Sequence, residues 1–295
     1  MINTPPNRLG VCSWSLQAGS PAELVERVKA VGVSGVQLAL DPIRTGEWGE
    51  IETINALRRA NIAVYSGMIG MAGEDYSTLA TIKATGGVRP DHAWKTNLAA
   101  AKAGAGLARR LGLALVTFHA GFIPHGAGPE RTRMIQRLRE LADIFDDAGV
   151  RLGFETGQET ANTLLEALAE LDRPGVGVNF DPANMILYGM GDPVAAMEAL
   201  APRVLQVHIK DALPSLSPGE WGSEVAAGTG AVDWPAFFRV LGARGLGCDL
   251  LIEREAGTQR IKDVSKARAL ASKHLAARAS PARAKAAARK PARSR

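Results

Sequence analysis

The stretch Val150-Arg-Leu-Gly-Phe-Glu155 is a short apolar run that ends in a carboxylate, and three later runs end likewise in a carboxylate or an imidazole. They are Val176-Gly-Val-Asn-Phe-Asp181, Val204-Leu-Gln-Val-His208 and Leu250-Leu-Ile-Glu253. Runs of this length, rich in Val, Ile, Leu and Phe, are typical of buried β-strands. The second half of the chain therefore predicts four strands, each ending in a residue that can bind a metal ion.

Similar apolar runs occur throughout the chain, and segments with helical spacing separate them. The runs lie near residues 8–14, 35–40, 62–68, 113–119, 150–156, 176–181, 204–210 and 248–253. The helical segments cover residues 21–31, 47–60, 91–111, 129–148, 160–171, 192–203, 234–244, and from 258 into the C-terminal tail. Eight strand-then-helix units in about 275 residues match the size and order of a (β/α)₈ TIM barrel.

A doubly wound open α/β sheet is the alternative fold, but the count of eight with no division into halves favours the barrel. We expect one barrel domain over residues 1–277 and a disordered basic tail over 278–295. The 295 residues are 46% hydrophobic and 22% charged, which excludes a disordered or fibrous protein.

The net charge of +5 comes from the tail, which holds seven basic residues and no acidic one. Without them, 28 basic and 30 acidic residues remain, a net charge of −2. The charge therefore indicates no acidic ligand for the barrel, and nucleic acid is not expected as a partner beyond non-specific contact by the tail. No apolar run is long enough for a membrane span and no secretory signal is present, so we expect a cytoplasmic protein without a membrane partner.

The polar residues at the strand ends are expected to point into the barrel. Neighbouring residues of a strand face opposite sides, so apolar Leu152 and Phe154 on the outside place Glu155 inside. The same alternation places Asp181, His208 and Glu253 at the inner mouth, where barrel enzymes carry their chemistry. Carboxylates this close repel one another, and a divalent cation removes the conflict. Oxygen ligands with one imidazole suit Mn²⁺ first, with Mg²⁺ and Co²⁺ as alternatives, better than a structural Zn²⁺.

The motifs around these residues resemble the sugar phosphate isomerase/epimerase family, the xylose isomerase-like TIM barrels. The likeness covers residues 8–275 and rests on segments 154–159, 179–185, 207–211, 228–234 and 252–255. The resemblance implies that Glu155, Asp181, His208 and Glu253 hold one divalent metal ion. It further implies that Glu155 and Glu253 form the acid/base pair, and that the substrate is a small sugar or keto-sugar.

The chain departs from the ketose epimerases of that family at three positions. Asn184 and Pro214 stand where those enzymes carry a sugar-binding His and Arg, and Ala161 stands in place of a Glu. The expected activity is therefore isomerisation or epimerisation through proton removal next to a carbonyl. A lyase or dehydratase acting on inososes or 3-keto-glycosides is the alternative.

Further side chains are candidates for binding substrate. His119 ends the fourth strand, and strand alternation points it into the barrel. There it would contact substrate, shuttle a proton or serve as a hydrogen-bonded structural histidine. Lys210 lies two residues after His208 and therefore points into the barrel as well. Trp14, at the end of the first strand, would form either an apolar wall of the substrate site or part of the core. Gln158 follows a metal-ligand candidate and is expected either to support the metal ligands or to contact sugar hydroxyls, and Asn184 is a further candidate for binding substrate. The long segment 213–231 has no periodicity and is predicted to be a lid.

Two other classes of function fit the sequence less well. An abasic-site endonuclease of the same superfamily needs several more histidines than the five in this chain. A barrel that binds a sugar without turnover does not need a complete four-ligand set. A homo-oligomer is compatible with the sequence, because an apolar helix face that packs on a partner looks like one that packs on the core.

Overall fold

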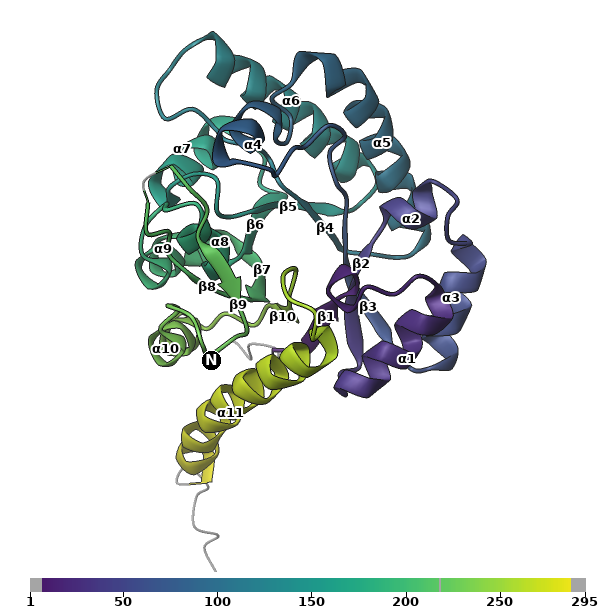
Figure 1. Ribbon diagram of the computed structural model, residues 1–295, viewed down its shortest axis with the longest axis vertical. Coiled ribbons are helices and arrows are strands. Elements are labelled where there is room, and N and C mark those ends of the chain that lie inside the picture. The colour runs from purple at the N-terminus through teal and green to yellow at the C-terminus, as the bar shows by residue number, and fades with distance from the viewer. Residues whose placement is uncertain (1–6, 218, 288–295) are drawn as a thin grey trace, which may run out of the picture.

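The computed structural model describes residues 7–217 and 219–287. Within these residues eight parallel strands close into a barrel in the order β1-β10-β7-β6-β5-β4-β3-β2 (Figure 1). The strands are β1 (Leu9–Cys12), β2 (Gly35–Ala39), β3 (Ala63–Met68), β4 (Leu115–Phe118), β5 (Arg151–Glu155), β6 (Val176–Phe180), β7 (Val204–Ile209) and β10 (Asp249–Ile252). The predicted TIM barrel is confirmed, and the open sheet is excluded because β1 pairs with β10.

Helices surround the barrel, and each follows the strand before it in the chain (Figure 1). They are α1 (Pro21–Val31), α3 (Glu50–Arg59), α5 (Asp91–Arg110), α6 (Pro129–Asp147), α7 (Ala161–Leu171), α9 (Pro193–Leu200), α10 (Trp234–Ala243) and α11 (Arg260–Ala287). Side-chain caps fix several helix starts: Thr160 accepts a hydrogen bond from the Thr163 amide, and Asp233 from that of Ala236. The core lies between strands and helices, around phenylalanines such as Phe118, Phe154 and Phe180.

Several short elements lie outside the simple strand-helix alternation, all at the carboxyl ends of the strands except η2, which directly precedes β7. They are the 3₁₀ turns η1 (Ser13–Leu16) and η2 (Ala201–Arg203), helices α2 (Asp41–Arg44), α4 (Leu79–Thr85) and α8 (Pro182–Leu187), and strands β8 (Asp211–Leu213) and β9 (Ser223–Val225). Strands β8 and β9 pair antiparallel. The segment after β7, predicted as a lid without regular structure, thus contains a β-hairpin.

Helix α11 continues past the expected domain boundary at residue 277 and ends at Ala287. The rest of the predicted tail, residues 288–295, lies outside the described residues, so the division into barrel and tail stays a prediction. Nowhere in residues 7–217 and 219–287 does a helix have the length and apolar character needed to cross a membrane.

Candidate metal centre

Four buried side chains converge at the carboxyl ends of β5, β6, β7 and β10. Glu155, Asp181, His208 and Glu253 are each at most 4% exposed. One potential ligand atom from each lies within 4.8 Å of the others. His208 Nδ1 is 3.5 Å from Glu155 Oε1, 3.5 Å from Asp181 Oδ2 and 3.3 Å from Glu253 Oε2. The structure thus brings together the four residues that the sequence analysis selected.

Two atoms of this cluster are buried polar groups without a hydrogen-bond partner. Asp181 Oδ1 caps α8 by accepting hydrogen bonds from the amides of Ala183 and Asn184, at 2.8 and 3.0 Å. This leaves Asp181 Oδ2 unpartnered in the cluster, together with His208 Nδ1. A buried acceptor without a partner costs stability unless a ligand satisfies it. Two such atoms beside two further carboxylates fit one divalent cation.

The contact of His208 Nε2 with Gln37 bears on which ring nitrogen of His208 carries the proton. His208 Nε2 lies 2.8 Å from Gln37 Oε1, which can only accept a hydrogen bond. Gln37 is held in turn through its Nε2, which donates to Thr117 Oγ1 at 2.7 Å. In the neutral imidazole that a metal ion would bind, the shorter contact with Gln37 favours the proton on Nε2, with the lone pair of Nδ1 facing the carboxylates; the Asn179 amide nitrogen lies 3.1 Å from the same Nε2. Gln37 is the kind of hydrogen-bond partner that orients metal-binding histidines.

The carboxylates of Glu155 and Glu253 are held by neutral donors and by one lysine. Asn184 and Asn179 donate to the two oxygens of Glu155, at 2.9 and 3.0 Å. Trp14 Nε1 donates to Glu253 Oε1, and Lys210 Nζ to Glu253 Oε2, both at 2.8 Å. Both catalytic candidates are therefore fixed in position rather than free to rotate.

Charge keeps both glutamates ionised although both are buried. Burial raises the pKa of Glu253, but Lys210 and, when no metal ion is bound, the protonated His208 outweigh burial and hold this pKa well below its usual range. Burial also opposes ionisation of Glu155, and the neighbouring His119 and His208 lower its pKa. At Asp181 burial dominates and raises the pKa. Two of the three carboxylates thus favour the charged form that a metal ion requires.

A cavity of about 430 Å³ opens over this cluster. Trp14, Asn184, Lys210 and His119 line it, as expected for substrate-binding side chains. His119 Nε2 lies 3.8 Å from Glu155 Oε1. Gln158 does not line the cavity; it is buried behind it and donates to the Tyr188 hydroxyl at 3.5 Å.

The cavity has further lining residues that the sequence analysis did not select. Some come from the short elements around the mouth, where no periodicity marks a position. They include Asp41, Glu74, Tyr76, Tyr188 and Glu255. Trp221 also lines the cavity and lies in the segment 213–231 that was predicted to be a lid. Gln37 was missed for another reason: its inward parity on β2 was readable, but the sequence did not show which distant histidine it meets.

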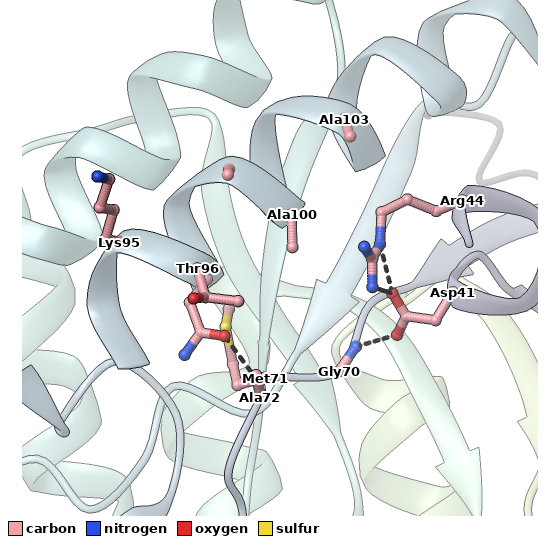
Figure 2. Close-up of a pocket in the computed structure, with 11 residues that line it drawn as sticks. Asp41, Arg44, Gly70, Met71, Ala72, Lys95, Thr96, Ala100 and Ala103 are labelled. Atoms are coloured by element: carbon pink, nitrogen blue, oxygen red, sulfur yellow. Dashed lines mark hydrogen bonds and ion pairs between the residues drawn. The ribbon is translucent and has the colours of Figure 1, made fainter. Parts of the chain in front are cut away.

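A second cavity of about 740 Å³ lies outside the barrel, beside α5 (Figure 2). Figure 2 shows Lys95, Thr96, Ala100 and Ala103 along one side, and opposite them Asp41 bonded to Arg44 and to the Gly70 amide. The four cluster residues line neither cavity. The smaller cavity is the candidate active site because Trp14, Lys210 and Asn184, which line it, donate hydrogen bonds to Glu253 and Glu155.

The family model of the xylose isomerase-like TIM barrel matches residues 25–275. The chain belongs to this family. This xylose isomerase-like barrel is 32% identical to a solved xylose isomerase domain protein from Planctomyces limnophilus, with a TM-score of 0.85, covering 94% of this chain and 100% of that one.

Two further solved structures share only the fold. An L-ribulose 3-epimerase is 17% identical with a TM-score of 0.70, over 97% of this chain and 100% of that one. The probable 3-DHS dehydratase AsbF from Bacillus anthracis is 18% identical with a TM-score of 0.67, over 90% and 98%. Among curated proteins, the uncharacterized protein YihM of Escherichia coli (strain K12) is 32% identical over 96 residues, which are 32% of this chain and 29% of YihM.

Proposed function

We propose that this protein is a divalent-metal-dependent enzyme that isomerises or epimerises a sugar by removing a proton from a carbon next to a carbonyl. The observation that carries the proposal is the cluster itself: three carboxylates and one imidazole, buried within 4.8 Å of one another below an open cavity. Glu155, Asp181, His208 and Glu253 would hold the metal ion. When bound, a divalent cation stabilises the negative charge that develops on neighbouring substrate oxygens. Mn²⁺ is our first choice, with Mg²⁺ and Co²⁺ as alternatives.

Glu253 and Glu155 are the proton-transfer groups of the proposed reaction. Both are ionised, so either can accept the proton from carbon, a role worth about 10²–10⁴-fold in rate. The Lys210 ammonium, 2.8 Å from Glu253 Oε2, fixes that carboxylate and places positive charge beside the enediolate that forms. Return of the proton to the adjacent carbon gives an isomer, and delivery to the opposite face gives an epimer.

His119 supports a second candidate, β-elimination by a lyase or dehydratase. Burial alone would lower its pKa, but Glu155 and other nearby carboxylates outweigh burial and raise it. A protonated imidazole at the cavity wall is placed to protonate a leaving hydroxyl or alkoxide once the α-proton has gone. The endonuclease alternative gains no support, since His208 and His119 are the histidines at this site among the described residues, and His125 is on an exposed loop.

Proton NMR in D₂O tests the proposal. The purified protein with Mn²⁺ is incubated with ketoses, inososes and 3-keto-glycosides, and the Mn²⁺ is removed by chelation before spectra are recorded. Deuterium next to the carbonyl shows proton removal, and the product distinguishes isomerase from lyase. Glu253→Gln, with Mn²⁺ binding checked by calorimetry, should lose the exchange. A wild-type protein that binds Mn²⁺ yet exchanges no proton in any of these sugars would refute the proposal.

A further inference from the structure

The walls of the candidate active-site cavity are rich in negative charge. Asp41, Glu74 and Glu255 line it, whereas Lys210 and His119 are the lining residues that can be positive. Among the described residues, no arginine lines this cavity. Sites that bind phosphate or carboxylate groups usually present arginine or lysine side chains with donors to spare.

The cations at or near the cavity are already engaged by acidic partners. Lys210 Nζ donates to Glu253 Oε2 at 2.8 Å and to Glu255 Oε2 at 2.5 Å. Arg44, beside Asp41, pairs with its carboxylate at 2.8 Å. Arg254, which follows Glu253, is bound by the carboxylates of Glu224 and Asp263, at 2.8 and 3.1 Å. An anionic substituent on a substrate would meet Glu74, which has no ion-pair partner among the described residues, and would find Lys210 already paired with Glu253 and Glu255.

Aromatic rings form the outer part of the same cavity. Tyr188 and Trp221 pack edge to face with their ring centroids 4.8 Å apart, and Tyr76 contacts His119 in the same geometry at 6.4 Å. Trp221 Nε1 is buried and has no hydrogen-bond partner. Aromatic rings with a polar edge suit a ligand that offers an apolar face and hydroxyl acceptors, such as a sugar ring.

The cavity also has more room than one sugar ring needs. A hexose has twelve non-hydrogen atoms, and at about 15 Å³ per close-packed atom it fills about 180 Å³. The cavity measures about 430 Å³, so a monosaccharide over the metal ligands leaves the aromatic outer part unfilled.

We propose, building on the proposed function, that the substrate is an uncharged keto-glycoside with two rings. The ring that carries the carbonyl lies over Glu155 and Glu253, and the second ring packs between Tyr76, Tyr188 and Trp221. Phosphorylated and carboxylated sugars are excluded because Glu74 has no ion-pair partner among the described residues, whereas Lys210 and Arg44 are already paired with acidic side chains.

The size of the substrate is tested with two uncharged probes in the D₂O exchange assay with Mn²⁺. A 3-keto-disaccharide should react with a kcat/KM at least about tenfold above that of the single-ring 3-ketoglucose, the size of effect expected from one aromatic contact. Trp221→Ala should lower this ratio about tenfold, mainly through KM. Tyr76→Ala, at a 45% exposed position, should also lower it and is safe for folding. Ile51→Ala, 78% exposed on α3, is the control and should leave the ratio unchanged.

Charge selectivity is tested with D-fructose 6-phosphate and 3-dehydroshikimate, one a phosphate and the other a carboxylate. Neither should exchange, and the phosphate should inhibit poorly. Glu74→Gln keeps an oxygen that can accept the hydrogen bond from the Gly87 amide, now 2.9 Å from Glu74 Oε1. This variant should lower the Ki of the phosphate about three- to tenfold, because one negative charge is removed from the wall. Glu50→Gln, on the outer face of α3, should not change it.

The outcomes separate the two proposals. Efficient exchange of the phosphate or the carboxylate, or equal kcat/KM for the single-ring and two-ring sugars, would overturn the assigned substrate class and leave the proposed enzyme intact. Absence of exchange with every probe, with Mn²⁺ bound, would overturn the proposed function itself.

Discussion

Asp211 should contribute more to the stability of the barrel than its position on a surface hairpin suggests. It begins β8, directly after the metal-ligand strand, and its carboxylate is buried. Oδ2 accepts hydrogen bonds from the amides of Gly228 and Gly230 and from Trp234 Nε1, at 2.8, 3.1 and 3.0 Å. Oδ1 accepts from the amides of Ala212 and Val232, at 3.0 and 3.2 Å. This one side chain therefore holds the segment that follows the β8–β9 hairpin, from Gly228 to Trp234, against the start of β8. Trp221 lies in the loop between these two strands.

The cost of Asp211→Asn follows from this arrangement. Whichever side the amide nitrogen takes, it faces at least two N–H donors and loses their hydrogen bonds. Hydrogen bonds to a charged group contribute about 1.5–3 kcal/mol each, so the loss is about 3 kcal/mol or more. That corresponds to a fall in Tm of roughly 5–10 °C for a domain of this size.

Thermal unfolding in EDTA, followed by circular dichroism, measures this effect without a contribution from bound metal. The control is Asp233→Ala, which removes a single helix cap, the hydrogen bond from the Ala236 amide at 2.9 Å. A lost cap costs about 1 kcal/mol, so this variant should lose about a third as much stability. If Asp211→Asn changed Tm no more than Asp233→Ala, the carboxylate would not hold the hairpin in the manner described.

Three more predictions concern the metal ligands and their surroundings. Mn²⁺ at about 100 times its Kd should stabilise the folded protein by about 2.7 kcal/mol and so raise its Tm. This rise in Tm should vanish in Glu155→Gln. An undiminished rise in the variant would show that the ion binds elsewhere. Gln37→Leu should weaken Mn²⁺ binding about 10–100-fold by calorimetry, because the shortest contact of His208 Nε2, 2.8 Å to Gln37 Oε1, is then lost. Gln17→Leu at an exposed position should bind normally. Burial raises the pKa of the Glu159 carboxyl to about 8. The folded state therefore keeps a proton on Glu159 that the unfolded state releases above about pH 4.5. The free energy of unfolding should fall as the pH rises to about 8, by up to about 5 kcal/mol. Urea titrations of wild type and Glu159→Gln should converge at pH 4 and diverge in favour of the variant at pH 9; parallel profiles would contradict the shift.

The sequence was sufficient to predict the barrel and the convergence of the four candidate metal ligands because both depend on periodicity. Strand alternation fixes the side to which Glu155 and Glu253 point, and strand order fixes the edge where they meet. The segments around short elements such as α4 and α8 have no such period, so residues such as Tyr76 and Tyr188 were not recognised as cavity walls.

Contacts between distant segments were decided by the tertiary structure alone. Gln37 and His208 are 171 residues apart and meet only because β2 and β7 enclose the same barrel interior. Gly230 is another case, since a side chain there would come within 2.2 Å of Asp211 Oδ1. The sequence by itself determined which residues lie at the mouth of the barrel, through local alternation. The charge balance, the tautomer of His208 and the shape of the cavity depend on through-space distances, which only the folded chain defines.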